Sequence, residues 1–382
     1  MNILENDNMF IDYQLNHYFM EKYKNLNLNY LDAVSEYINN AKSPCNFTWI
    51  EIIHKNKIEI YFLQNSNILN IMSNKDTILE YYNSEIIKKQ TLLIQNSIIN
   101  FPFFVIRSGW DVQFIHIDQP CLLRTSRREH NDFGVLIPDS STQSLDVLYN
   151  FKKQFENINY KNKQNSLIWR GVYSGIVTEK NNDFIQYNDV KFKYYSRHYF
   201  INKFYNKYDT KFFVTNYLGT EELILHSEQR SNYVLPEIMA TKYKYQIALN
   251  GNSFAGSFGW NLLSNSVVFH PKYEDNFYTY IFPRENIDYI SIKDNYEDLD
   301  EKISYFNYNE DKAEIIALNG KKYIEKLINL SELLTKKTME KIYLLYNQET
   351  LLDAVQFMDK HLTKINVILD SYQNFIIYTN ET

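Results

Sequence analysis

The sequence predicts an α/β protein with a parallel sheet, on three observations. Beyond residue 166, short apolar runs typical of buried strands alternate with segments of helical periodicity, as in βαβ units. Polar or glycine-rich residues follow several of those runs, where open parallel sheets bind ligands. Near the C-terminus, apolar residues recur at three- and four-residue steps, which predicts a helical tail.

The first half of the chain mixes both kinds of element. Residues 57–63 alternate apolar and polar side chains, which predicts a strand, and 68–99 have helical periodicity. Residues 101–106, 112–117 and 134–137 are interpreted as buried strands. The polar stretch 158–165 is interpreted as a linker between two domains.

The second half carries the βαβ pattern. Strands are expected at 166–169, 211–214, 243–249, 267–269 and 289–292, and helices at 235–239, 256–263 and 299–306. Residues 312–346 and 351–370 are predicted to be helical, the latter with one apolar stripe. The stripe is interpreted as a packing face, and a role of these helices in assembly stays open.

Composition excludes several classes of protein. The 382 residues include 40 Lys and Arg against 46 Asp and Glu, a net charge of −6, which argues against a protein that coats nucleic acid. No apolar run approaches the roughly 20 residues of a membrane span. The two cysteines, Cys45 and Cys121, form no disulfide framework, and the first twelve residues do not resemble a signal peptide.

Familiar cofactor and metal motifs are missing from the sequence. It has no GxxxxGK[ST], GxGxxG, HExxH or CxxC string. Asp298-Leu299-Asp300 matches an Asp-x-Asp metal pattern, but it opens a helical segment, where capping and the helix dipole explain acidic residues. We therefore expect neither a metal nor a cofactor.

Two segments point to a phosphate-containing ligand. Trp169-Arg170-Gly171 ends a predicted strand, and arginine suits bidentate phosphate contacts. The segment 250–260 follows another strand and holds three of the nine glycines, which let backbone approach a ligand closely. A surface arginine and an ordinary flexible loop are the alternative interpretations.

These segments resemble glycosyltransferase family 90. The resemblance rests on 242–253, on 260–269 followed by Pro271, and upstream on Trp169-Arg170-Gly171 and 197–200. The family includes bacterial lipopolysaccharide-modifying, fungal capsule-associated and animal protein O-glucosyl- and O-xylosyltransferases. The similarity spans about 105–330 and is strongest to the bacterial-type branch.

The resemblance implies a GT-B-like fold of two Rossmann-like lobes with parallel sheets. The expected domains are an acceptor-side lobe over 1–160, a nucleotide-sugar-binding lobe over 161–330 and a helical tail over 331–382 that packs on the first lobe. It also implies an inverting, metal-independent transferase that moves a sugar from a nucleoside-diphosphate donor, such as UDP-glucose or UDP-xylose, to a hydroxyl of a glycan acceptor. That acceptor would be a lipopolysaccharide, glycoprotein or polysaccharide. A cytoplasmic location is expected, with peripheral membrane association left open.

The resemblance also assigns site residues. Asp118, after a strand and before Pro120, matches the catalytic base; Asp111 is the alternative, and a turn-forming Asp118 is the non-catalytic one. The donor-binding residues would be Arg170, Gly171, Arg197, Asn250, Gly251, Asn252, Ser253, Ser257, Ser264, Asn265 and Ser266. For Arg197 a surface position, and for 264–266 helix capping, remain alternatives.

The chain departs from the family at Ser253, Ser257 and Gly259, where relatives often carry charged residues. These departures put the diphosphate contacts in doubt. The second hypothesis is therefore a non-catalytic nucleotide-sugar or glycan-binding protein on a transferase scaffold.

Overall fold

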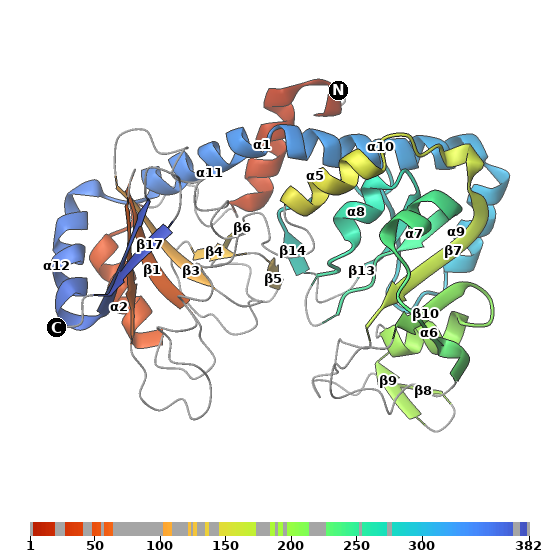
Figure 1. Ribbon diagram of the computed structural model, residues 1–382, viewed down its shortest axis with the longest axis horizontal. Helices are drawn as coiled ribbons and strands as arrows, with labels where there is room; N and C mark the ends of the chain where they lie inside the picture. The colour runs from red at the N-terminus through yellow and green to blue at the C-terminus, as the bar shows by residue number, and fades with distance from the viewer. Residues whose placement is uncertain are drawn as a thin grey trace. The chain divides into compact units, whose positions relative to one another are not determined.

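The computed structural model of the 382-residue chain describes residues 3–19, 27–40, 48–54, 57–63, 102–108, 121–123, 125–127, 134–136, 145–172, 184–187, 190–193, 197–213, 227–251, 254–272, 277–369 and 375–379 (Figure 1). The chain divides into two compact units. Unit 1 comprises Met1–Ser140, Tyr278–Tyr280 and Leu330–Thr382, and unit 2 comprises Ser141–Phe277 and Ile281–Asn329.

The described part of unit 1 is built on a mixed sheet in the order β17-β16-β2-β1-β3-β4-β6. Its strands are β1 (Thr48–Ile53), β2 (Lys57–Phe62), β3 (Phe103–Ser108), β4 (Cys121–Leu123), β6 (Gly134–Leu136), β16 (Thr363–Leu369) and β17 (Phe375–Thr379). Pairing is antiparallel from β17 to β3 and parallel only between β3, β4 and β6. The prediction of parallel sheets in both lobes therefore holds in this unit only for β3, β4 and β6 and is wrong for the other pairs. The short connection between β1 and β2 allows only antiparallel pairing of those two strands.

Helices from both ends of the chain pack in unit 1. They are η1 (Ile3–Glu5), α1 (Asp7–Tyr18), α2 (Tyr30–Asn40), α11 (Ser331–Leu345), η7 (Gln348–Thr350) and α12 (Leu351–His361), and the short strand β5 (Thr125–Arg127) pairs with β14 (Phe277–Thr279). Asn6 caps α1 by accepting a hydrogen bond from the amide of Met9 at 3.1 Å. Helix α1 contacts α11, and the ring of Tyr30 stacks on Tyr346 at 4.4 Å.

The C-terminal tail is only partly helical. The helix predicted over 351–370 ends at His361, and Thr363–Leu369 forms β16 instead, antiparallel to β2. Ile365 and Val367 are buried while Ile368 is 39% exposed, which is the alternation of a half-buried strand. The helical prediction beyond His361 is therefore wrong, because pairing with β2 favours the β-branched residues in a strand.

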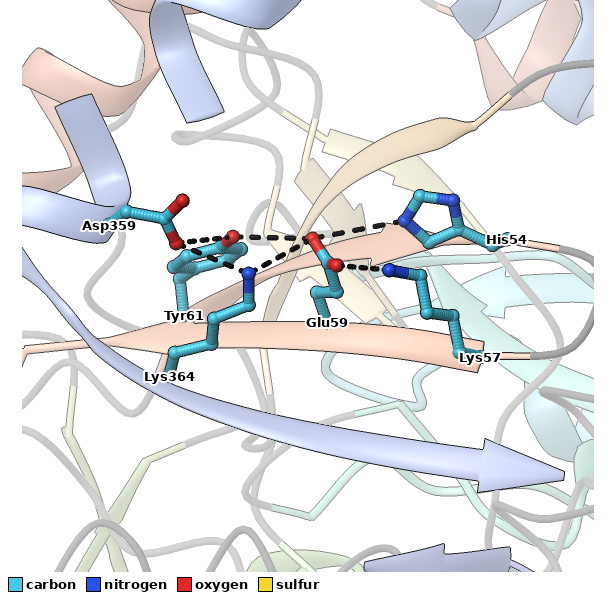
Figure 2. A network of polar contacts seen from close by, with 6 residues as sticks. All are labelled: His54, Lys57, Glu59, Tyr61, Asp359 and Lys364. Atoms are coloured by element: carbon cyan, nitrogen blue, oxygen red, sulfur yellow. Dashed lines mark hydrogen bonds and ion pairs between the residues drawn. The ribbon is translucent and has the colours of Figure 1, made fainter. Parts of the chain in front are cut away.

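A network of charges ties β16 to β2 (Figure 2). The Glu59 carboxylate lies 2.6 Å from Lys57 Nζ, 3.4 Å from Lys364 Nζ and 3.8 Å from His54 Nε2. The nearby His54, then the hydrogen bond from Lys57 and the charge of Lys364, hold the pKa of Glu59 well below its usual value although burial alone would raise it. The network joins four places in the chain: His54 directly after β1, Lys57, Glu59 and Tyr61 on β2, Asp359 on α12 and Lys364 on β16.

The described sheet of unit 2 is parallel throughout, in the order β11-β10-β7-β12-β13-β15. Its strands are β7 (Gln164–Gly171), β10 (Asp209–Phe213), β11 (Arg230–Ser231), β12 (Tyr243–Ile247), β13 (Val267–Lys272) and β15 (Ile290–Lys293). The chain runs from β7 outward to β11 and then returns to β12 beside β7. This order is that of a doubly wound dinucleotide-binding sheet, with its topological switch point between β7 and β12.

Helices cover both faces of this sheet (Figure 1). The helical and hairpin elements are α5 (Leu145–Gln154), η4 (Tyr160–Asn162), β8 (Phe184–Tyr187), β9 (Val190–Lys193), α6 (Arg197–Phe204), η6 (Ser227–Gln229), α7 (Pro236–Lys242), α8 (Phe258–Leu263), α9 (Leu299–Tyr308) and α10 (Glu310–Asn329). Residues of α6, α9 and the start of α10 share one core with the strands, whereas α8 contacts α5 and α10. The α/β class and the parallel sheet expected beyond residue 166 are confirmed.

The polar stretch 158–165 lies within unit 2 and not between the units. Tyr160 and Lys163 are buried in it, and β7 begins at Gln164. It is therefore a packed segment and not a free linker. Among the helices that the structure describes, none combines the length and apolar character needed to cross a membrane.

Candidate functional site

The switch point between β7 and β12 brings together predicted residues from distant parts of the chain. Arg170 and Gly171 end β7, and Asn250 and Gly251 follow β12. Since β7 and β12 are parallel neighbours, these residues lie at the same carboxyl edge of the sheet. Doubly wound sheets bind their ligands in the crevice outside this edge.

Arg197 spans the switch point. It is the first residue of α6, and its Nη1 donates to the carbonyl of Val172 at 3.0 Å while Nη2 donates to the carbonyl of Leu249 at 2.9 Å. Its guanidinium carbon lies 5.7 Å from the ring centre of Trp169. Because arginine stays protonated in proteins, Arg197 fixes a positive charge where the ends of β7 and β12 meet.

Arg170 instead turns toward β10. Its Nη2 lies 2.5 Å from Asp209 Oδ1, its Nη1 donates to the Asp209 carbonyl at 2.6 Å, and its side chain is 8% exposed. Asp209 also accepts a hydrogen bond from the Tyr243 hydroxyl. Burial alone would raise the pKa of Asp209, but the bonds from Tyr243 and Arg170 outweigh it and hold the pKa below its usual value. Arg170 therefore neutralises a carboxylate in this structure.

Gly171 gives room for a folded-back indole at the end of β7. A Cβ atom at Gly171 would lie 2.5 Å from a ring carbon of Trp169. The Trp169 ring in turn packs edge-on against Phe200 and Phe212. Gly171 thus lets the strand end close to the ring that lies under Arg197.

Asn250 shapes the turn that leaves β12. Its Oδ1 accepts a hydrogen bond from the amide of Ala255 at 3.0 Å, which closes the turn across its base. Ser257 precedes α8, and its Oγ accepts from Asn261 at 3.4 Å. Asn252 and Ser253, which the sequence assigns to the same turn, lie outside the described residues.

His270 was missed by the sequence reasoning. It lies near the end of β13, with Nδ1 2.9 Å from the Ala248 carbonyl and its ring 5.3 Å and 5.1 Å from those of Phe254 and Phe258. Burial lowers the pKa of His270 to about 4, although the bond to Ala248 opposes this, so the ring is neutral at physiological pH. Its position directly after the apolar run 267–269, at a strand's carboxyl end, was the signal available in the sequence.

Ser264, Asn265 and Ser266 lie at the opposite edge of the sheet, where β13 begins. Lys163 Nζ donates to the carbonyls of Ser264 and Asn265 at 2.6 Å and 2.8 Å, and to Ser266 Oγ at 2.8 Å. Asn265 has a φ of 56°, a left-handed conformation that asparagine tolerates. The structure therefore does not bring these three residues to the carboxyl edge with Arg197 and Asn250.

Comparison with known protein families decides the family of the chain. The model of glycosyl transferase family 90 matches residues 143–343. The chain belongs to glycosyl transferase family 90. A search of curated proteins found no match. The family match includes the whole parallel sheet of unit 2 and both of its edges.

In this family 90 chain, neither the family match nor the structure covers the predicted catalytic base. Asp118 and its alternative Asp111 precede the matched region and lie outside the described residues. Their catalytic role remains a prediction from the sequence.

The Asp-x-Asp string of this family 90 member is engaged in structural contacts. Asp298 Oδ1 accepts from the amide of Lys293 at 2.8 Å and its Oδ2 lies 2.8 Å from Lys302 Nζ, so it ties α9 to β15 and does not cap α9. Asp300 Oδ2 lies 2.7 Å from Lys207 Nζ. Within the described ranges no three His, Cys, Asp or Glu residues form a group that could hold a metal.

Proposed function

We propose that the chain transfers a sugar from a nucleoside-diphosphate donor, most simply a UDP-sugar such as UDP-glucose or UDP-xylose, to a hydroxyl of a glycan acceptor. One observation carries the donor site: Arg197 bridges Val172 and Leu249 at the switch point, inside the family match. A permanent positive charge beside two strand ends suits a diphosphate. A two-lobed GT-B-like arrangement, with a mixed sheet in unit 1 and a parallel sheet in unit 2, is part of this proposal.

The proposed reaction is a single displacement. The acceptor oxygen bonds to the anomeric carbon as the bond from that carbon to the diphosphate oxygen breaks, which inverts the configuration. Asp118 takes the proton of the attacking hydroxyl. The leaving diphosphate gains negative charge, and Arg197 stabilises it in place of a metal ion.

The donor site is tested by calorimetry with UDP after a thermal-shift screen of nucleotide sugars. Loss of charge-assisted hydrogen bonds in Arg197→Ala should weaken UDP binding by about ten- to a hundredfold. The matched control is Arg230→Ala, since Arg230 is exposed on the edge strand β11. Equal affinities in the two variants would contradict the proposed site.

The mechanism is tested by turnover. Transfer should persist in EDTA and should be lost in Asp118→Asn. Full activity of Asp118→Asn would remove Asp118 as the base, and loss of activity in EDTA would contradict metal independence.

A second candidate is a non-catalytic protein that binds the same donor. One observation in its favour is that Arg170 pairs with Asp209. The other is Gly259, where a Cβ would lie 2.8 Å from Leu148 Cδ2 and 2.9 Å from Ile281 Cδ1. A charged side chain at Gly259 would therefore have to displace the ends of these two apolar side chains. UDP binding without transfer to any glycan would support this candidate.

A further inference from the structure

We infer that His270 is a positioning residue that holds the turn after β12, and with it Asn250, in the conformation that receives the donor. This inference rests on the proposed function, because it concerns the edge of the sheet to which the donor is assigned. His270 itself lies on β13, the next strand along the sheet.

The imidazole is fixed by its backbone partner. A carbonyl oxygen can only accept, so the contact of 2.9 Å between Nδ1 and the Ala248 carbonyl places the proton of the neutral ring on Nδ1. Ala248 lies two residues before Asn250, between the end of β12 and the turn. The N–H of His270 thus holds the chain where it leaves the sheet.

The same ring packs against the returning side of the turn. The ring centres of Phe254 and Phe258 lie 5.3 Å and 5.1 Å from that of His270 and 5.2 Å from each other. The ring centre of Tyr289 lies 6.2 Å from that of His270. Ala255 lies between these two phenylalanines in the sequence and is buried. Its amide donates to Asn250. One side chain therefore contacts the described parts of the turn on both sides, 248–251 and 254–258.

Two substitutions separate the N–H from the ring. His270→Phe keeps an aromatic ring and loses the donor, whereas His270→Asn keeps an amide N–H near the position of Nδ1 and loses the ring. If His270 positions the turn, His270→Phe should weaken UDP binding about tenfold, and His270→Asn should recover most of that loss despite its poorer packing. The control Phe306→Leu removes a buried ring that contacts Phe269 on the other face of the sheet, and should lower only the melting temperature.

The pH profile gives a second readout. His270 is neutral above about pH 4, and Tyr289 is the titratable side chain among the rings around it. Each variant should therefore change the donor affinity by the same factor at every pH between 6 and 8. A new or lost inflection in this range would show that His270 takes part in proton transfer and would overturn the positioning role.

Hydrogen exchange separates this inference from the proposed function. Amides of 248–251 and 254–258 should exchange faster in His270→Phe than in the wild type, with or without UDP. If exchange is faster in His270→Phe but the wild type binds no nucleotide, only the proposed donor site is contradicted. Unchanged exchange and unchanged UDP affinity in a folded His270→Phe protein would overturn the inference.

Discussion

At both edges of the parallel sheet in unit 2, side-chain nitrogens donate to backbone carbonyls, but the two edges differ in their expected roles. At the carboxyl edge, Arg197 and His270 donate to the carbonyls of Leu249 and Ala248 and fix the start of the turn after β12. At the amino edge, Lys163 donates to two carbonyls and to Ser266 where β13 begins. In both places a cationic or neutral nitrogen on one element holds the backbone of another.

The difference lies in what surrounds each nitrogen. Lys163 is 5% exposed and its contacts are closed over, so burial, with the charge of Lys321 added, lowers its pKa. Gln246 completes this cluster through Ser264 Oγ at 2.9 Å. The amino edge is therefore sealed by internal hydrogen bonds, whereas the carboxyl edge holds a guanidinium at the switch point of the fold. We expect substitutions at the amino edge to change stability and substitutions at the carboxyl edge to change donor affinity.

Replacement of Lys163 should have the largest effect on stability. Lys163→Met leaves the carbonyls of Ser264 and Asn265 buried without their donor, which should lower the free energy of unfolding by about 3 kcal/mol. Chemical denaturation measures the loss. UDP affinity of the folded variant should match that of the wild type.

The matched control is Lys161→Met. The Lys161 side chain is 63% exposed and pairs with Glu314 at 3.3 Å, so its loss should change stability by under about 1 kcal/mol. If Lys163→Met weakened UDP binding as strongly as Arg197→Ala, the contrast between the two edges would be lost.

Unit 1 offers a second buried charge for comparison with Lys163, the Glu59 carboxylate on strand β2. The pKa of Glu59 is lowered in the folded state, so its contribution to stability is complete above its unfolded pKa of about 4.3 and is lost as the pH falls toward the folded value. Glu59→Gln should lower stability by about 1–2 kcal/mol at pH 7 and flatten the fall in melting temperature between pH 6 and 3. Glu340→Gln, an exposed partner of Lys337 on α11, should leave that fall unchanged. An equally steep acid transition in Glu59→Gln would contradict a role for this carboxylate.

Chain direction explains which site residues could be placed from the sequence. Arg170 and Asn250 follow predicted strands and do lie at the carboxyl edge, whereas Ser264–266 precede the strand at 267–269 and so belong to the amino edge of a parallel sheet. That order was readable, but the resemblance grouped both segments together. The pairing of Arg170 with Asp209, 39 residues away, has no local pattern and required the fold.

The same limit applies to the tail. The apolar residues of 351–369 fit helical spacing, and only the pairing of β16 with β2, some 300 residues earlier in the chain, selects a strand beyond His361. Local pattern was sufficient for five of the six strands in the sheet of unit 2, because these five are short apolar runs. The edge strand β11 (Arg230–Ser231) is too short and polar to be predicted in this way. It was insufficient wherever a distant partner decides the conformation.

The smallest effects test the edges with a matched pair of conservative changes. Ser266 Oγ accepts from Lys163 and donates to the Tyr243 carbonyl at 2.9 Å, so Ser266→Ala should lower stability by about 1 kcal/mol and leave UDP affinity unchanged. Asn250→Ala removes the acceptor for the Ala255 amide, so it should weaken UDP binding severalfold with a similar loss of stability. Calorimetry and thermal unfolding on both variants decide the point. Because the two changes remove one polar group each, equal UDP affinities would mean that the carboxyl edge contributes no more to donor binding than the sealed edge does.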